Sequence, residues 1–291
     1  MSKQENSGDT GLVRLSKRMG ELGICSRREA DAWIAKGWGC VDGVKVEELG
    51  TKIRPDQKIT VNNAAKTEQA EKVTILLNKP LGYVSGQAED GYEPAKVLIT
   101  DENHWSEDPV KKSFRPFQRK GLVPAGRLDI NSTGLLVLTQ DGRVAKMLIG
   151  EESSIDKEYI VRVIPVDGTS NADFPEEKLK LLNFGLEIDG KKLLRAKVEW
   201  INDNQLRFVL REGRNRQIRK MCEAVGLKVL QLKRVRIGAI NLGKLPIGKW
   251  RYLQENESFN SADPHHKKTS FSFSKKPINP KRNSYGNRKK F

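Results

Sequence analysis

Four consecutive apolar residues, 135–138 (LLVL), lie between two polar turns near the middle of this 291-residue chain. A short apolar run that is bounded by turn signals is typical of a strand buried inside a sheet. The turn after it contains Asp141 and Gly142, and the turn before it carries Arg127 and Asp129. A turn that leads into a rigid buried strand can fix a polar side chain at the edge of a cleft. We therefore predict a sheet with a candidate site at Asp129.

The patterns on both sides of this strand mix helices and strands in no regular order. Further strands are predicted at residues 73–77, 158–164, 194–201 and 205–211. Helices are predicted at residues 175–184 and 215–225. Residues 86–121 are polar, show no clear period and stay unassigned. Because the order lacks a repeating βαβ unit, we predict a mixed α+β fold whose sheet is mainly antiparallel.

Residues 12–63 are predicted to form a small separate domain of two helices and a small sheet. The sequence Ser26-Arg27-Arg28-Glu29 has the form of a capping box, which marks the start of a helix. Asp42-Gly43 lies between two short strand-like stretches and is a strong hairpin signal. Residues 64–72 (AAKTEQAEK) are interpreted as a linker, and residues 73–255 as the larger second domain.

The distribution of charge points to a polyanionic partner. The chain carries 53 Lys and Arg residues against 37 Asp and Glu residues, a formal net charge of +16. Residues 256–291 hold +7 of this charge, and their Ser, Asn, Lys and Pro content predicts a disordered tail. The tail either keeps the chain soluble or adds phosphate contacts. The remaining +9 makes the folded body itself basic.

Several classes of function are excluded by what the sequence lacks. No run of about 18 apolar residues occurs, which excludes a membrane-spanning helix, and the first residues show no apolar signal-peptide core. The three cysteines lie far apart, and the histidines are His104 and the pair His265-His266, so neither a disulfide framework nor a zinc site fits. No glycine-rich nucleotide motif is present. We therefore predict a cytoplasmic protein that uses no metal or cofactor.

A second candidate site lies in residues 212–222 (EGRNRQIRKMC), at the start of a predicted helix. Basic residues at a helix start form a good phosphate site. At about 100° per residue, Arg216 and Lys220 lie opposite the apolar stripe of the helix, facing water or RNA. Arg219 lies at the edge of that stripe, where it can turn inward to a carboxylate. A merely solvated basic helix is the alternative interpretation.

Five motifs, in this order, resemble bacterial RNA pseudouridine synthases of the RsuA/RluB/RluE/RluF family. They are residues 78–82 (NKPLG), 126–129 (GRLD) with 132–139 (STGLLVLT), 157–159 (KEY), 214–222 (RNRQIRKMC) and 232–238 (LKRVRIG). Residues 14–30 resemble an S4 RNA-binding module, and residues 215–223 resemble RluF in particular. The resemblance implies a monomeric isomerase that converts a uridine of structured RNA to pseudouridine without a cofactor. The implied substrate is ribosomal RNA, large-subunit 23S RNA first, with small-subunit RNA and tRNA as alternatives.

The resemblance also implies roles for individual residues. Asp129 matches the catalytic aspartate, and Arg219 matches the arginine that pairs with it. Tyr159 matches the tyrosine that stacks on the flipped base, and Leu232 matches the apolar wall of the uracil pocket; without the family, both would be interpreted as core residues. Arg127 is expected to contact substrate as well. RNA-backbone contacts are expected of Arg14, Lys17, Ser26, Arg27, Arg28, Arg214, Arg216 and Lys220.

Two other classes of function stay open at this point. One is a catalytically silent S4-type RNA-binding or ribosome-assembly protein, and the other is a basic DNA-binding protein. The intact Gly126-Arg-Leu-Asp129 motif, together with Tyr159 and Arg219, favours the enzyme over the silent protein. The S4-like module argues against DNA as the partner. The charged segment 86–121 looks longer than in the shortest family members and is expected to affect RNA docking.

Overall fold

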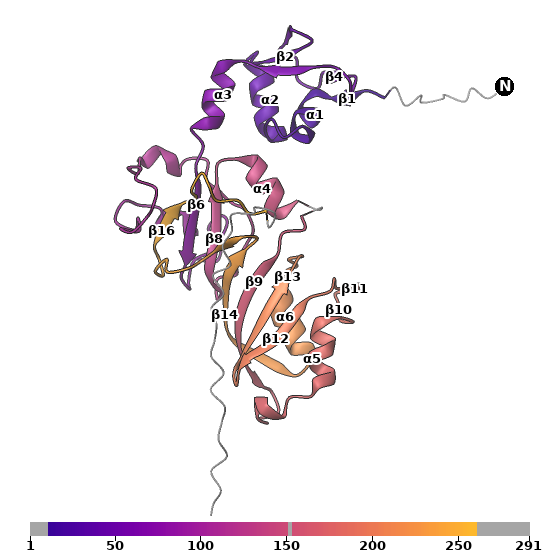
Figure 1. Cartoon of the computed structure of the whole chain (residues 1–291), viewed down its shortest axis with the longest axis vertical. Helices are drawn as coiled ribbons and strands as arrows, with labels where there is room; N and C mark the ends of the chain where they lie inside the picture. The colour runs from indigo at the N-terminus through magenta and orange to yellow at the C-terminus, as the bar shows by residue number, and fades with distance from the viewer. Residues whose placement is uncertain (1–10, 151–152, 261–291) are drawn as a thin grey trace, which may run out of the picture. The chain divides into compact units, whose positions relative to one another are not determined.

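The computed structural model describes residues 11–150 and 153–260 (Figure 1). Within these ranges, none of the helices combines the length and the apolar character that crossing a membrane requires.

The N-terminal part of the chain forms a small module around a core of its own. Its elements are β1 (Val13–Arg14), α1 (Leu15–Glu21), α2 (Arg27–Ala35), β2 (Gly39–Val41), β3 (Val44–Val46), β4 (Lys52–Ile53) and β5 (Ile59–Val61). The predicted hairpin is confirmed, since β2 pairs antiparallel with β3 and also with β5. The predicted capping box is confirmed as well, because the Ser26 hydroxyl accepts the Glu29 N–H while the Glu29 carboxylate accepts the Ser26 N–H.

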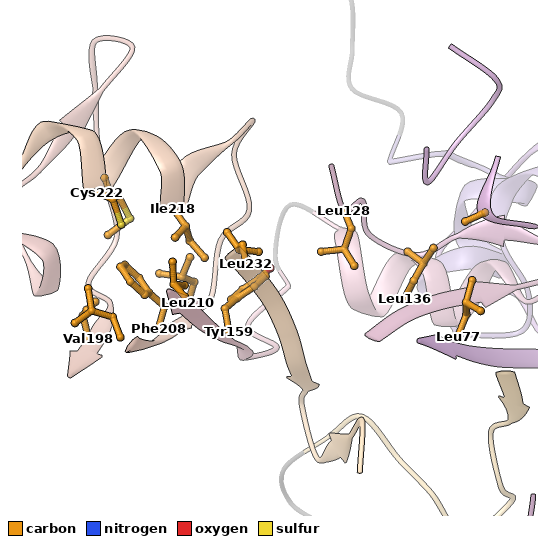
Figure 2. Close-up of a cluster of buried hydrophobic side chains, with 14 of the residues drawn as sticks. Leu77, Leu128, Leu136, Tyr159, Val198, Phe208, Leu210, Ile218, Cys222 and Leu232 are labelled. Carbon is orange, nitrogen blue, oxygen red and sulfur yellow. The ribbon is translucent and has the colours of Figure 1, made fainter. Parts of the chain in front are cut away.

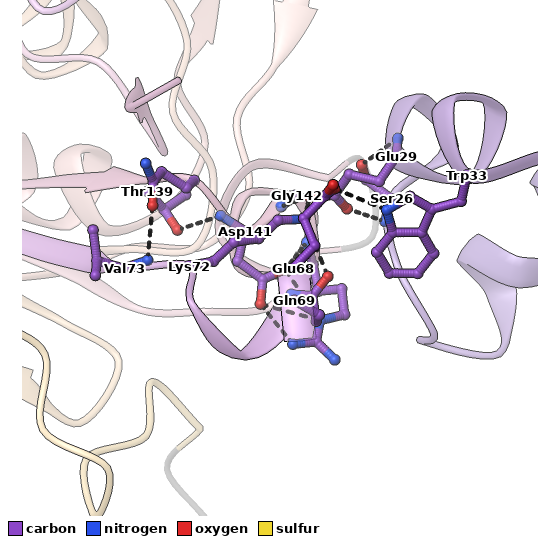
Figure 3. Close-up of polar contacts among 12 residues, drawn as sticks. Ser26, Glu29, Trp33, Glu68, Gln69, Lys72, Val73, Thr139, Asp141 and Gly142 are labelled. Atoms are coloured by element: carbon purple, nitrogen blue, oxygen red, sulfur yellow. Dashed lines mark hydrogen bonds and ion pairs between the residues drawn. The ribbon is translucent and has the colours of Figure 1, made fainter. Parts of the chain in front are cut away.

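Residues 64–72, interpreted above as a linker, fold mostly into helix α3 (Asn63–Ala70). The Asn62 side chain caps this helix by accepting the N–H of Ala65, and Ala65 is fully buried in the core of the N-terminal module. The Trp33 indole donates to Glu68 at 2.9 Å, as Figure 3 shows. The segment is therefore a helix that packs on the N-terminal module. The helix buries few side chains, so its composition is almost as polar as that of a linker.

A nine-stranded sheet dominates the rest of the described chain, in the order β12-β13-β9-β14-β8-β6-β16, with β15 beside β14 and β7 beside β8. Its first members are β6 (Thr74–Lys79), β7 (Val123–Pro124), β8 (Thr133–Thr139) and β9 (Lys157–Pro165). The others are β12 (Lys197–Asn202), β13 (Gln205–Leu210), β14 (Leu227–Ile237), β15 (Ile240–Asn241) and β16 (Trp250–Tyr252). Strands β14 and β8 run parallel, and the other pairs of this sheet are antiparallel. The predicted α+β class with a mainly antiparallel sheet is confirmed.

Strand β8 contains the apolar run that the sequence marked as a buried strand. Residues 135–138 are all 0% exposed, and they alternate between two hydrophobic clusters on the two faces of the sheet. Leu136 and Leu138 belong to the cluster that also contains Leu77 and Leu128 (Figure 2). The prediction of a strand buried on both faces is confirmed.

The helices of this part are α4 (Gly142–Ile149), α5 (Glu176–Asn183) and α6 (Gln217–Ala224), and the hairpin β10 (Glu187–Ile188) and β11 (Lys191–Lys192) lies between α5 and β12. Three short 3-10 turns complete the set at η1 (Ala95–Leu98), η2 (Pro116–Arg119) and η3 (Asn171–Asp173). The helices predicted at 175–184 and 215–225 are confirmed, although both begin later than predicted. Helix α4 was not predicted, because Asp141-Gly142 has the composition of a turn. Asp141 instead caps the helix by accepting the N–H of Arg143.

Two segments complete the description of this part of the chain. The unassigned segment 86–121 is largely irregular, and it is held to β16 by Asp108, which is 2% exposed and accepts the N–H of Tyr252. The start predicted for the disordered tail, residue 256, is too early in the sequence. Phe259 is 2% exposed, and its carbonyl accepts the N–H of Ala239. The ordered part therefore extends to at least residue 260, and the rest of the predicted tail lies outside the described residues.

Candidate active site

A cleft of about 700 Å³ opens between the turn that precedes β8, the start of α6 and the facing surface of β9 and β14. Its lining contains all five residues that the sequence marked as catalytic or substrate-binding, namely Arg127, Asp129, Tyr159, Arg219 and Leu232. These residues come from four separate segments of the chain. The fold therefore gathers them into one concave site.

The turn that carries Asp129 is held by hydrogen bonds to its backbone. The Ser85 hydroxyl accepts the N–H of Leu128 at 2.8 Å and donates to the carbonyl of the same residue at 2.7 Å. On one side, the Arg234 guanidinium donates to the carbonyl of Arg127 at 3.2 Å. On the other side, the N–H of Ser132 donates to the carbonyl of Asp129 at 3.0 Å. The backbone is thus fixed on both sides of Asp129, whose side chain stays 36% exposed in the cleft.

Sequence reasoning missed Ser85 as a residue of this site. Ser85 is 4% exposed and lies in the irregular segment after β6, 43 residues before the residue whose backbone it holds. A lone serine in a loop gives no local signal of such a long-range contact.

Two arginines approach the carboxylate of Asp129. Arg219 Nε and Arg216 Nη1 each lie 3.9 Å from Asp129 Oδ2. Arg219 is the more buried, with a side chain 13% exposed, and it also donates to the carbonyl of Asn131 at 2.8 Å. Burial lowers the pKa of Arg219, Arg216 lowers it further, and Asp129 opposes the shift. The inward orientation predicted for Arg219 is confirmed.

Arg216 was expected to lie opposite the apolar stripe of the helix, facing water or RNA, together with Lys220. The helix begins at Gln217 rather than at Asn215, and Arg216 precedes it with a left-handed backbone, at φ 50°. The position of Arg216 is therefore not set by the helical period. Its guanidinium lies beside Asp129 instead, 48% exposed at the rim of the cleft.

Tyr159 and Leu232 form an apolar part of the cleft floor. Tyr159 is 8% exposed on β9, and Leu232 is 7% exposed on the neighbouring strand β14. Figure 2 shows the two side chains next to each other, with Ile218 of α6 close by. Both belong to the hydrophobic core and both line the cleft. They are thus core residues that also present an aromatic and an aliphatic surface on which a planar ring can stack.

Two of the residues predicted to contact RNA on the 212–222 segment are engaged within the protein. Arg214 donates to Glu212 at 3.0 Å and to the carbonyls of Lys191 and Lys192 at 3.2 and 2.8 Å. Lys220 forms an ion pair with Asp189. Both side chains hold the β10–β11 hairpin against the start of α6. This use was not visible in the sequence, because the hairpin lies about 25 residues earlier in the chain.

The basic residues of the N-terminal module have fewer partners. Arg14, Arg27 and Arg28 are exposed and form no ion pair or side-chain hydrogen bond within the described ranges. Lys17 lies 3.7 Å from Glu21 in an exposed pair. Ser26, also predicted to contact RNA, caps α2 with its hydroxyl. The arginines at the start of α2 are therefore free to meet a phosphate. In the part of the chain that the structure describes, no group of Cys, His, Asp and Glu is arranged to hold a metal ion.

Comparison with known proteins assigns the family. A family model described as RNA pseudouridylate synthase matches residues 73–224. The ribosomal large subunit pseudouridine synthase B of Bacillus subtilis is 33% identical over 252 residues, which cover 84% of this chain and 94% of that protein. The dual-specificity RNA pseudouridine synthase RluF of Escherichia coli is 36% identical over 247 residues, which cover 84% of this chain and 77% of that protein.

A solved structure supports the same assignment. The crystal structure of a pseudouridylate synthase superimposes with a TM-score of 0.54 at 25% identity, covering 83% of this chain and 96% of that chain. The matched family region includes Asp129, Tyr159 and Arg219 of the cleft. The resemblance found in the sequence motifs is confirmed, and the chain belongs to the RNA pseudouridine synthase family, whose members are isomerases that act on RNA.

Proposed function

We propose that this pseudouridine synthase modifies a uridine of ribosomal RNA, with Asp129 as its catalytic residue and without a cofactor. The observation that carries the proposal is the placement of Asp129. Its carboxylate is partly exposed in the cleft, lies 3.9 Å from each of two arginines and shares the cleft with Tyr159 and Leu232. The name of the Bacillus subtilis relative favours large-subunit 23S RNA as the substrate. The name of the Escherichia coli relative states a dual specificity without naming the RNAs, and we propose transfer RNA as the second substrate.

The side chains of the cleft suit the steps of this isomerisation. A uridine that is stacked or paired in folded RNA has to flip out of the stack before it reaches an enzyme group. The Tyr159 ring stacks on the flipped base, and Leu232 forms the apolar wall beside it. Asp129 then acts either at C1′ of the ribose or as the base that removes a proton at C2′. Arg219 holds the carboxylate in place through their ion pair.

The reaction rearranges bonds without changing the atoms of the nucleoside. The bond between C1′ and N1 breaks, the detached uracil turns, and C5 bonds to C1′. N1 then carries a proton, and C5 loses the one it held. No electron acceptor and no phosphoryl donor take part, which agrees with the absence of nucleotide-binding motifs from the sequence.

The N-terminal module docks the RNA in this proposal. Arg27 and Arg28 occupy the first turn of α2, where the helix dipole adds to their attraction for phosphate. Arg14 and Lys17 add further exposed positive charge at the start of α1. These contacts are independent of base sequence and sensitive to salt. We expect the enzyme to act as a monomer in the cytoplasm.

The test compares Asp129→Asn with the wild-type chain on transcripts of 23S RNA, 16S RNA and tRNA. Pseudouridine is mapped by carbodiimide modification and primer extension. We expect a discrete site with the wild type and a rate at least about 10³-fold lower with Asp129→Asn, while RNA affinity is preserved. Asp203→Asn, in the exposed turn between β12 and β13, is the matched control and keeps full activity.

Two results would overturn the proposal in different ways. Equal rates for Asp129→Asn and the wild type would exclude Asp129 as the catalytic residue. Tight RNA binding by the wild type, with no pseudouridine formed on any of the three RNAs, would favour the silent RNA-binding protein.

A further inference from the structure

The floor of the cleft has a cationic end next to its apolar end. Lys157 lies two residues before Tyr159 on β9, and Arg234 lies two residues after Leu232 on β14. Residues two apart on a strand point to the same face, so all four side chains belong to the cleft surface. Both cations line the cleft, and Arg234 lies directly opposite Tyr159 in the strand register. On each strand, the apolar residue and the cation of the cleft floor are therefore nearest neighbours on the same face.

These two cations are buried, and neither has a carboxylate partner. Lys157 is 8% exposed and Arg234 is 2% exposed, and neither forms an ion pair with a described residue. The Lys157 ammonium donates only to the carbonyl of Ile155, at 3.2 Å. Arg234 donates to the carbonyl of Leu135 at 2.7 Å and to that of Arg127, while its Nη2 is buried without a hydrogen-bond partner.

A third buried cation lies near these two, and the nearby carboxylates of Asp129 and Asp156 form no ion pair with Lys157 or Arg234. Lys79 is fully buried, and its pKa is lowered to about 8 by burial and by Arg234, against the opposing effect of Asp129. The pKa of Lys157 is lowered by burial and by Arg234, with Asp156 opposing. Buried charges in proteins are normally paired, because an unpaired one loses its hydration without compensation. Two cations without ion pairs that line an open cleft, one of them with a buried N–H donor that has no partner, therefore indicate a site for an anion.

The chemistry of the two groups selects the kind of anion. An arginine fixed in place offers directed N–H donors, and a lysine on a flexible chain offers a mobile point charge, a pair that suits a phosphate. Neighbouring residues on the same face of a strand lie about 6.7 Å apart. An anion at Lys157 and Arg234 is therefore close enough to a ring on Tyr159 to belong to the same nucleotide.

We propose that Lys157 and Arg234 form a phosphate subsite, which binds the phosphodiester next to the uridine held by Tyr159 and Leu232. The identity of the base rests on the proposed function, whereas the anion site rests on the buried cations alone. The subsite orders the substrate from base to phosphate along β9 and β14. It thus sets the direction in which the RNA strand enters the cleft.

The test measures binding of uridine, uridine 3′-monophosphate, uridine 5′-monophosphate and inorganic phosphate to the full chain by ligand-observed NMR titration. We expect one of the two monophosphates to bind about tenfold more tightly than uridine. Lys157→Met removes that gain and leaves the affinity for uridine unchanged, whereas Lys157→Arg keeps it. Lys233→Met is the matched control, because Lys233 is an exposed cation on the opposite face of β14 and its loss keeps the gain.

Several outcomes would overturn the subsite. They are no measurable binding by either monophosphate, equal affinity for uridine and both monophosphates, and a gain that survives in Lys157→Met. Methionine keeps most of the apolar length of lysine, so folding is checked through the melting temperature, which is expected to be unchanged or higher. A lower melting temperature together with an intact phosphate gain would show that Lys157 is structural.

The same variants separate this inference from the proposed function. Lys157→Met is expected to lower kcat/KM for the RNA about tenfold. If the monophosphate gain depends on Lys157 but no RNA is converted, the phosphate subsite holds and the proposed function fails. If RNA is converted and the Lys157→Met chain is as active as the wild type, the proposed function holds and the subsite fails.

Discussion

Strands β9 and β14 carry cations on both faces, and the two faces differ in what accompanies them. On the face away from the cleft, Glu158 accepts two hydrogen bonds from Arg207, at 2.7 and 3.1 Å, and one from Arg236 at 2.8 Å. On the cleft face, neither Lys157 nor Arg234 forms an ion pair with a carboxylate of the described residues. Lys157 and Glu158 are neighbours in the chain, yet the strand turns them toward opposite environments.

The difference separates two uses of charge in one strand pair. The outer face compensates its cations within the protein, and the arrangement stabilises the fold. The cleft face leaves its cations uncompensated, which costs stability and preserves affinity for an anion, as functional sites commonly do. If the two faces differ in this way, removing a charge should destabilise the protein on the outer face and should not destabilise it on the cleft face.

The largest effect is expected from Gly134→Ala, because Gly134 packs directly against the backbone of β14, which carries residues of both faces. Gly134 on β8 lies against β14 with φ at +103°, and an added Cβ would come within 2.2 Å of the Arg234 carbonyl oxygen. That overlap and the unfavourable backbone angle are expected to cost about 4 kcal/mol or more in the free energy of unfolding. Urea unfolding measures the loss. The control is Gly86→Ala, where nothing lies within 4 Å and the change should stay below about 1 kcal/mol.

The next effect is expected from Glu158→Gln on the outer face. The amide keeps the shape but removes the charge that Arg207 and Arg236 share, so unfolding should become easier by about 2 kcal/mol. Glu199→Gln is the matched control, because Glu199 also binds Arg207 but is 45% exposed, and its loss should cost at most about 1 kcal/mol. Equal losses in the free energy of unfolding for the two variants would show that the buried Glu158 stabilises the fold no more than the exposed Glu199 does.

Lys157→Met is expected to change stability in the opposite direction to Glu158→Gln. Removing an uncompensated buried charge should raise the free energy of unfolding by up to about 1 kcal/mol in the absence of nucleotide. The exposed Lys228 on the same strand pair provides the control, and Lys228→Met should stay within about 0.5 kcal/mol of the wild type. A clear loss of stability in Lys157→Met would mean that the two faces do not differ in this way.

The smallest effect is a pH dependence that belongs to the outer face. Burial alone would raise the pKa of Glu158, but the hydrogen bonds and charges of Arg207 and Arg236 bring it below its ordinary value. The stabilisation is therefore complete above the ordinary pKa of glutamate, about 4.3, and is lost as the pH falls through the lower folded value. The difference between the wild type and Glu158→Gln, measured by urea unfolding at stepwise lower pH, should shrink below about pH 4. A difference in stability that stays constant as the pH falls would contradict the lowered pKa of Glu158.

The sequence was informative where the governing contact is local. The capping box at Ser26 and the apolar run of β8 depend on neighbours in the chain, and both were predictable. The inward orientation of Arg219 was also predictable from the helical period. The period places Arg219 at the edge of the buried stripe of α6, and from there its side chain reaches Asp129.

The remaining features depend on partners that are distant in sequence. Arg214 looked like a phosphate ligand, but its guanidinium binds the backbone of a hairpin that no local pattern ties to α6. Lys157 and Arg234 lie in the motifs 157–159 and 232–238, but the sequence assigned neither of them a role, because only the register of β9 and β14 brings them together. Helix α4 was missed for a different reason, since Asp141-Gly142 has the composition of a turn, whereas here the aspartate serves as the N-cap of a helix.

The parallel contact between β14 and β8 has a mechanical consequence. It registers only two residue pairs, Lys233 with Thr133 and Arg234 with Gly134, whereas β9 and β13 share six, as do β6 and β8. The Asp129 turn stands on one side of this short contact and Tyr159 on the other, and Arg234 ties the two sides together by donating to the carbonyls of Leu135 and Arg127. The gap between the carboxylate and the base therefore depends on the contact between β14 and β8 and on Arg234.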